Sequence, residues 1–255
     1  MMSFEVAADA YGRFMGRFSE QLATAFLDLL EVREGRALDV GCGPGVLTAP
    51  LVARLGASKV AAVDPSESFV AAARDRLPGV DIRHGHAEEL PFGGDEFDVT
   101  LAQLVVHFMS DPVRGLAEMA RVTRPGGLLG TSVWDHPGDR GPLSPFWRAV
   151  RELSPGHGGE DDLAGSREGD LVRLCGLGGW ADVEGTTLTV SSRFDSFEDW
   201  WEPYTLGVGT AGGYLVTLDP DTQAALHEQC RAQLGAGPFE IEATAWVATG
   251  RVSGP

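Results

Sequence analysis

The chain has 255 residues, of which 43% are hydrophobic, and this is enough for one large α/β domain or for a domain with a cap. The 20 Lys and Arg against 37 Asp and Glu give a formal net charge of -17, which opposes binding to nucleic acid and to anionic lipid surfaces. Because no apolar run reaches about 18 residues, we expect no membrane span.

The cysteines Cys42, Cys175 and Cys230 are widely spaced, and the sequence contains no CxxC pair. This pattern argues against a disulfide framework or a metal site and favours a reducing compartment. The first residues show no basic stretch followed by an apolar one, so we expect no signal peptide. We therefore predict a cytoplasmic protein.

In chain order, helical spacing of apolar residues predicts a helix over 19–30, with Ser19 as its N-cap. Strands and helices then alternate, as they do in βαβ units. The expected strands are 36–40, 59–63, 80–84, 97–102 and 128–133, and the helices between them are 46–55, 66–77 and 111–122. Parallel strands joined in this way form a sheet covered on both faces, with the ligand site at their carboxyl ends.

The alternation breaks after Trp134. The expected elements are a short helix at 146–153, a helix at 171–178, a strand at 182–190, an aromatic run at 197–204, a helix at 221–234 and a strand at 239–249. We predict one domain over 1–255. Its parts are a cofactor-binding core at about 19–134, a cap insertion at about 135–220 and a C-terminal strand at 239–249.

The run LDVGCGPGVLT at 38–48 joins a buried strand to a helix through three glycines at alternate positions. Glycine tolerates a positive φ and, because it has no Cβ, lets the backbone approach a ligand closely. A dinucleotide fingerprint, GxGxxG or GxGxxA, would need Gly or Ala where Val46 stands, and the phosphate-binding GxxxxGK[ST] is absent. The alternative is a turn that only connects strand to helix.

Asp64 ends the second strand, about 20 residues after the glycine turn, where an acid can accept hydrogen bonds from the two hydroxyls of a ribose. The alternative is that Asp64 caps the helix that begins near Ser66. The ribose role is the favoured interpretation.

Five segments, LDVGCGPG, VDPSESFVAAAR, HAEELPF, FDVTLAQLVVHFMSD and EMARVTRPGGLL, follow one another over about 37–130. Their order and spacing resemble the class I S-adenosylmethionine-dependent methyltransferases of the small-molecule type (methyltransferase type 11), which include enzymes similar to those of ubiquinone and menaquinone biosynthesis. The resemblance implies an α/β fold: a Rossmann-like seven-stranded mixed sheet with the last strand antiparallel, helices on both faces and a small cap. It also implies methyl transfer from S-adenosylmethionine to a small-molecule acceptor, with S-adenosylhomocysteine as product.

The resemblance further implies which residues bind the cofactor. The methionine and ribose side of the cofactor would be lined by Asp39, Gly41, Cys42, Gly43 and Gly45, and Asp64 would hold the ribose hydroxyls. The adenine would be flanked by Pro65 or Ser66 and would contact His86, Ala87 and Glu88. Gln103 and Leu104 would approach the amino end of the methionine, and Tyr11 and Arg17 would cover the cofactor. Arg17 can pair with the cofactor carboxylate. The alternative for Tyr11 is plain aromatic packing.

One position departs from the family pattern. His86 stands where relatives usually carry an Asp that accepts from the adenine amino group. Either a neutral imidazole nitrogen accepts in its place, or the backbone of Ala87 carries the adenine alone.

Methyl transfer by in-line displacement needs no enzyme nucleophile, so positioning and desolvation are the expected contributions. A hydroxyl acceptor would also need a general base, and the candidates are His107 and His136, each with structural packing as the alternative. The acceptor pocket is expected from 1–17, from 135–165 and from the aromatic residues Phe194, Phe197, Trp200, Trp201 and Tyr204. A cap sealed on its own core is the alternative for these aromatic residues.

Two other functions remain open. An NAD(P)-dependent oxidoreductase is disfavoured by Val46 and by the lack of a recognisable Ser/Tyr/Lys catalytic set. A cofactor-binding but non-catalytic protein gains weight from His86. The motifs specify cofactor and fold; they name neither the methylated atom nor the oligomeric state.

Overall fold

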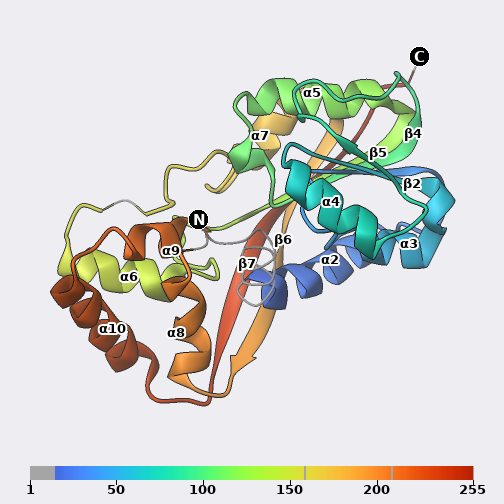
Figure 1. Ribbon diagram of the computed structural model, residues 1–255. Helices are drawn as coiled ribbons and strands as arrows, with labels where there is room; N and C mark the ends of the chain where they lie inside the picture. Colours follow the sequence, from blue (N-terminus) through green and yellow to red (C-terminus); the bar gives the residue numbers. More distant parts are fainter. Residues whose placement is uncertain (1–14, 158, 208, 255) are drawn as a thin grey trace. The chain divides into compact units, whose positions relative to one another are not determined.

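A computed structural model describes residues 15–157, 159–207 and 209–254 (Figure 1). These residues divide into two compact units. Unit 1 comprises the described part of 1–19 together with 134–163 and 189–244, and unit 2 comprises 20–133, 164–188 and the described part of 245–255. The single-domain organisation expected from the sequence stays a prediction.

The strands form one seven-stranded mixed sheet in the order β3-β2-β1-β4-β5-β7-β6. Their bounds are β1 (Ala37–Val40), β2 (Val60–Asp64), β3 (Asp81–His84), β4 (Phe97–Gln103), β5 (Thr123–Trp134), β6 (Ala181–Phe194) and β7 (Phe239–Arg251). The final strand, β7, runs antiparallel to both of its neighbours, whereas the other pairs are parallel. The predicted fold class is therefore confirmed.

The helices of unit 2 cover both faces of its part of the sheet (Figure 1). They are α2 (Arg17–Leu29, from Glu20 onward), α3 (Thr48–Leu55), α4 (Glu67–Arg76), α5 (Pro112–Val122) and α7 (Asp170–Leu177). Leu38 and Val40 of β1 share a core with α5 and α7, while Ala37 packs with α2 and α3. This division follows from strand geometry, because successive side chains point to opposite faces.

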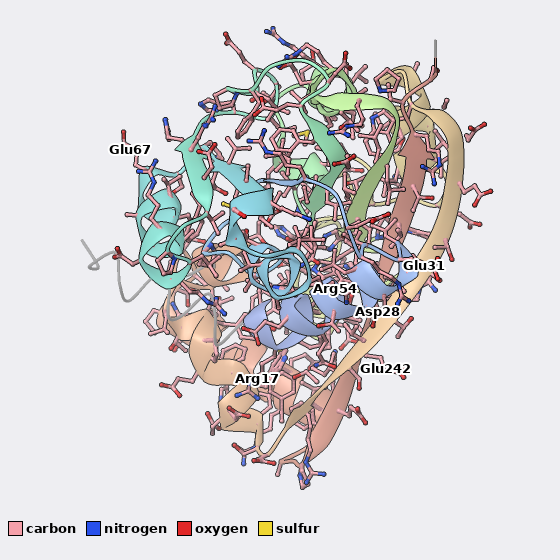
Figure 2. The ribbon with its side chains drawn as sticks, turned by 90° about the vertical axis from the view of Figure 1, so that its right-hand side faces the viewer. Arg17, Asp28, Glu31, Arg54, Glu67 and Glu242 are labelled. Carbon is pink, nitrogen blue, oxygen red and sulfur yellow. The ribbon has the colours of Figure 1, made fainter. Side chains whose placement is uncertain are left out.

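An ion pair joins two helices on the second of these faces. Arg54 of α3 donates a 2.6 Å hydrogen bond to Asp28 of α2 (Figure 2). Asp28 keeps 68% of its side-chain surface exposed, so water screens the pair and its contribution to stability is about 0.2–1 kcal/mol. The apolar core holds this face together.

Unit 1 contains the remaining helices of the described chain. They are α6 (Ser144–Leu153), α8 (Phe197–Thr205), α9 (Gly209–Leu215) and α10 (Pro220–Leu234). The stretch that forms α9 is not among the helices expected from the sequence. Its glycines are poor helix formers, which is why the local pattern did not indicate a helix.

Two local predictions are wrong. Ser19 does not cap α2, because it lies inside the helix and its hydroxyl donates to the Met15 carbonyl at 2.9 Å. Strand β5 begins at Thr123, five residues before the expected start at 128. The Pro-Gly-Gly stretch stays in the strand because Gly126 donates its amide to the Val252 carbonyl at 2.9 Å, a partner distant in sequence.

Candidate functional site

The glycine turn follows β1 directly, and the end of β2 holds it in place. The amides of Gly41 and Cys42 donate to the Val63 carbonyl at 2.8 and 3.0 Å. Gly41, Gly43 and Gly45 have φ values of 71°, 53° and 93°, a region that glycine enters without steric cost. All three glycines of the motif are thus required by backbone conformation.

The space around the three glycines differs. A Cβ on Gly41 would lie 2.5 Å from Val105, and one on Gly45 would lie 2.8 Å from Leu77, so protein packing excludes larger residues there. A Cβ on Gly43 would meet no described atom within 4 Å. Gly43 therefore borders open space, as a backbone that cradles a ligand does.

Asp64 ties this turn to the end of β2. Its Oδ2 accepts from the Gly43 amide at 2.8 Å, and its Oδ1 accepts from the Ser66 amide at 2.9 Å. The carboxylate is 6% exposed, and burial raises its pKa, while the hydrogen bonds from Ser66 and Gly43 lower it. The N-cap of α4 is Ser66, whose hydroxyl accepts from the Phe69 amide, so capping does not account for Asp64.

Asp39 lies one strand away and is almost fully buried, with 1% exposure. Thr48, the first residue of α3, donates its hydroxyl to Oδ2 of Asp39 at 2.6 Å. Burial, with a smaller contribution from the charge of Asp64, raises the pKa of Asp39 to about 7, against the hydrogen bonds from Thr48 that lower it. This carboxyl therefore exchanges its proton near neutral pH.

Cys42 is 5% exposed, and burial, followed by the charges of Asp39 and Asp64, raises the pKa of its thiol far above the usual range. Only a thiolate is a good nucleophile. The side chain acts here as a small buried group, in agreement with the sequence interpretation.

The segment after β3 places the predicted adenine residues in different surroundings. His86 is exposed and its ring lies edge-on to His84, with centroids 6.3 Å apart. Oε1 of Glu88 accepts from the amides of Ser110 and Asp111 at 2.7 and 3.2 Å, so this carboxylate holds the start of α5. The cofactor roles of His86, Ala87 and Glu88 stay predictions.

His84 belongs to this part of the molecule, and sequence reasoning missed it. Its Nε2 lies 3.0 Å from the carbonyl oxygen of Pro65, and its backbone pairs with Asp64 across β2 and β3. Its place in the sequence could have indicated it, because His84 ends the third strand as Asp64 ends the second.

The loop after β4 reaches the glycine turn through Val105, which packs against Gly41. Leu104 has a φ of 61°, and its amide donates to the Ser132 carbonyl at 2.9 Å. A non-glycine residue in this region costs of order 1–3 kcal/mol, and such strain concentrates at functional sites. Gln103 ends β4 immediately before it. The structure thus brings the predicted residues Gln103 and Leu104 to the strand edge that carries the turn.

The two candidate bases have different environments. His107 is half-buried in a short 3-10 turn, Val106–Phe108, with its ring 4.0 Å from that of Phe108. His136 is 8% exposed in unit 1, and its Nδ1 lies 3.5 Å from Oε2 of Glu160. Burial lowers the pKa of His136, against the charges of Glu160, Asp161 and Asp135 that raise it.

Arg17, also in unit 1, pairs with a carboxylate of the protein. Its Nη1 and Nη2 donate to Oδ2 and Oδ1 of Asp199 at 2.9 and 2.6 Å, and its guanidinium lies 4.9 Å from the centre of the Phe194 ring. The side chain of Arg17 is labelled in Figure 2. Its cofactor role stays a prediction, and Tyr11 lies outside the described residues.

The aromatic residues expected to line an acceptor pocket form the core of unit 1. All five are buried at 7% exposure or less: Phe194, Phe197, Trp200, Trp201 and Tyr204. Tyr204 stacks on Phe146 of α6 with centroids 4.8 Å apart and the planes 6° from parallel. Their burial favours the sealed-core alternative, and the pocket role stays a prediction.

Over the described residues, no group of three or more His, Cys, Asp or Glu side chains could hold a metal ion. The same part of the chain has no helix that is both long and apolar enough to cross a membrane.

The described residues combine a mixed sheet, a glycine turn after β1 and a strand-end acid bonded to that turn, which is the fold that the family resemblance implied. The comparisons agree. The family model described as a methyltransferase domain matches residues 38–130.

Relatives support the same class. An uncharacterised methyltransferase of Mycobacterium tuberculosis is 37% identical over 172 residues, which cover 68% of this chain and 62% of the relative. A ubiquinone biosynthesis O-methyltransferase of Rhizobium etli is 43% identical over 98 residues, 37% of this chain and 39% of the relative. This chain thus spans less than two thirds of the length of these relatives.

The crystal structure of a protein from Anabaena variabilis, described as a putative methyltransferase of an antibiotic biosynthesis pathway, matches with a TM-score of 0.64 and 20% identity, over 90% of this chain and 96% of that one. It shows the shared fold. Residues 38–130 of this chain therefore resemble class I S-adenosylmethionine-dependent methyltransferases, and S-adenosylmethionine is the cofactor that this resemblance implies.

Proposed function

We propose that the protein transfers a methyl group from S-adenosylmethionine to a small-molecule acceptor by in-line displacement. The observation that carries the proposal is Gly43, whose missing Cβ leaves open space and whose amide is held by Asp64 at 2.8 Å. A strand-to-helix turn of this kind lets backbone atoms contact a cofactor closely.

The proposed cofactor site uses residues of unit 2 at the carboxyl ends of three neighbouring strands, β1, β2 and β4. Asp64 would hold the ribose hydroxyls, since each carboxylate oxygen that accepts one backbone amide keeps a second lone pair. The other proposed contacts are Asp39, Gly41, Cys42, Gly43, Gly45, Pro65, Ser66, His86, Ala87, Glu88, Gln103 and Leu104. Tyr11 and Arg17 are retained as proposed covering residues.

When bound, S-adenosylmethionine supplies a methyl group on a positively charged sulfur. The chain contributes a rigid turn that fixes the cofactor's position, and orientation alone can supply on the order of 7 kcal/mol in favourable cases. The carboxylate of Asp64 adds negative charge near the turn, as does that of Asp39 when it is ionised.

The acceptor and the cellular location are also proposals. The net charge of -17 disfavours nucleic acid, and the name of the Rhizobium etli relative gives a small-molecule pathway for that protein. The three cysteines are all free and buried, which supports a reducing cytoplasm.

Calorimetry on the full chain tests the proposal with S-adenosylmethionine, S-adenosylhomocysteine and NAD. We expect both sulfur compounds to bind and NAD not to bind. Binding of NAD alone would favour an oxidoreductase. Binding of the sulfur compounds without turnover of a labelled methyl group against a metabolite extract would favour a non-catalytic protein.

A further inference from the structure

Unit 1 contains a cavity of about 390 Å³ between α8, the end of α9 and α10. All of its lining residues lie within 201–228, so the cavity is complete inside one compact unit. The glycine turn and the strand ends of the proposed cofactor site belong to unit 2. Pockets that hold small molecules have volumes of roughly 300–1,000 Å³, and this cavity is therefore a candidate site for a second molecule.

One part of the cavity wall is apolar. Trp201 of α8 and Leu215 of α9 are buried, with 7% and 2% exposure, whereas Val216, directly after α9, keeps 53% of its surface exposed. An apolar group bound in the cavity would remove the surface of Val216 from water, which is favourable. The wall therefore favours a ligand with an apolar body.

The polar part of the wall comes from one face of α10. The residues of this helix that line the cavity are Pro220, Gln223, Ala224, His227 and Glu228. Residues three and four apart share a helix face, which is why all five reach the same cavity. Nε2 of Gln223 donates to the Leu218 carbonyl at 2.9 Å and holds the side chain in place, and the amide oxygen of Gln223 is an acceptor.

Aromatic rings and carboxylates fix His227 at the cavity. Its ring stands edge-on to Phe197 and Trp201, with centroids 4.9 and 5.2 Å apart and planes at 89° and 90°. Its Nδ1 lies 3.2 Å from Oε1 of Glu228, and its Nε2 lies 3.5 Å from Oε1 of Glu198. The imidazole thus contacts Glu228 through one oxygen. A carboxylate has about four lone-pair sites, so Glu228 can accept further donors from a ligand.

The charge of this region favours a cation. Residues 197–230 include six Asp and Glu and no Lys or Arg, so the stretch that forms the cavity is acidic. Two arginines from outside the stretch offset two of these acids, because Arg17 pairs with Asp199 at 2.6 Å and Arg231 lies 3.5 Å from Glu198. The remaining negative charge attracts an ammonium group and repels a carboxylate.

We propose that this cavity binds a small organic ammonium compound, whose apolar body packs against Trp201 and Val216 and whose charged nitrogen donates to the carboxylate of Glu228. An ammonium group has up to three N–H donors, and Gln223 supplies a second acceptor in the same wall. The inference concerns unit 1 alone and is independent of the proposed methyl transfer.

Three probes with the same body and different head groups test the proposal on the full chain at pH 7. Phenethylamine carries an ammonium group, 2-phenylethanol a neutral hydroxyl and phenylacetate a carboxylate. ¹H–¹⁵N spectra report binding locally, through the indole N–H of Trp201 and the ring nitrogens of His227. We expect saturable shifts of both signals with phenethylamine, an affinity about 5-fold lower for 2-phenylethanol, and no saturable shift with phenylacetate.

A charge variant tests the role of Glu228. Glu228→Gln should lower the affinity for phenethylamine about 5-fold, as expected for an ion pair open to water, and should leave the affinity for 2-phenylethanol unchanged. Glu202→Gln is the matched control, since Glu202 is an exposed acid of α8 outside the cavity wall. Equal affinities of the two variants for phenethylamine would contradict the contact with Glu228 and overturn the inference.

Filling the cavity gives a test that does not depend on charge. Ala224→Leu adds a larger side chain to the wall, and α10 should stay folded because leucine is a good helix former. This variant should lose the shifts with phenethylamine and with 2-phenylethanol. Ala225→Leu, one residue further along the same helix and also exposed, should keep them. Thermal unfolding checks that both variants fold.

None of these measurements uses S-adenosylmethionine, so they stand whether or not the proposed function is correct. Binding of phenylacetate as tight as that of phenethylamine would show that charge does not select the ligand, and the inference would be wrong. It would also be wrong if millimolar phenethylamine gave no saturable shift, or if Ala224→Leu bound the probes as Ala225→Leu does.

Discussion

The amide of Gly43 donates a 2.8 Å hydrogen bond to Oδ2 of Asp64, and this bond joins the glycine turn after β1 to the end of β2. Gly43 borders open space, and Asp64 places a buried carboxylate beside it. The two halves of the proposed cofactor site are thus set by one contact, and each can be altered separately.

Gly43→Val should abolish binding of S-adenosylmethionine and leave a folded protein, because the new side chain would fill ligand space. Gly43→Ala should lose about 1 kcal/mol of stability from its positive φ and also weaken binding. Gly126→Ala is the matched control, since Gly126 has a φ of 76° and equally open surroundings. Calorimetry and thermal unfolding check both effects, and unchanged affinity in Gly43→Val would refute the site.

Asp64→Ala should weaken cofactor binding by roughly 1.5–3 kcal/mol, the range for hydrogen bonds to a charged group. It also frees the amides of Gly43 and Ser66, so stability must be measured in parallel. Asp219→Ala is the matched control. Asp219 also accepts hydrogen bonds from two backbone amides, at the start of α10, so its loss has a similar effect on the backbone away from the proposed site. Equal affinities of Asp64→Ala and the unmodified chain would contradict a ribose contact.

The stability of the protein should carry a pH dependence from Asp39. Its pKa is about 7 in the folded state and 3.8 as the ordinary value, so the folded state binds the extra proton between these pH values. The stabilisation from this group is complete below about pH 4 and is lost as the pH rises to about 7.

Asp39→Asn removes this dependence. The difference in unfolding free energy between the unmodified chain and Asp39→Asn should therefore change by on the order of 4 kcal/mol between pH 4 and pH 8. Denaturant unfolding at a series of pH values measures it, and a constant difference would show that the group does not titrate there. Thr48→Val should extend the loss to higher pH, because the Thr48 hydrogen bond lowers the pKa of Asp39.

Variants of Arg17 and Asp199 together test whether Arg17 binds the carboxylate of the cofactor. Both side chains are about one third exposed, so breaking their ion pair should cost about 0.2–1 kcal/mol of stability in either variant. If Arg17 also binds the cofactor, Arg17→Gln weakens S-adenosylmethionine binding and Asp199→Asn does not. Equal affinities in the two variants would leave Arg17 with a structural role alone.

Much of the sheet could be predicted from the local pattern of apolar residues in the sequence. The strand expected at 97–102 is β4, Phe97–Gln103, and the helix expected at 111–122 is α5, Pro112–Val122. The apolar residues of both elements are buried as their spacing predicts, and Asp111 and Pro112 begin the helix as expected. The start of β5 was misplaced because its backbone partner Val252 lies more than a hundred residues further along the chain.

The contacts within unit 1 could be predicted less well from the sequence. Glu160 stands among Asp161 and Asp162 in a stretch of glycines and acids, where nothing in the sequence distinguishes it. Trp147 and Thr210, one on each side of it in the chain, make it the buried carboxylate. His136 was a candidate from its place after the fifth strand, but its partner could not be predicted.

The sequence by itself indicated the glycine turn and the strand-end acid, because glycine, acid and apolar spacing are local properties of residue types, and its resemblance to a family implied the cofactor. Only the tertiary structure decided that the aromatic run is buried, that β7 lies between β5 and β6, and that Glu160 faces His136. Burial and pairing of this kind depend on residues far apart in the chain, which no local pattern can specify.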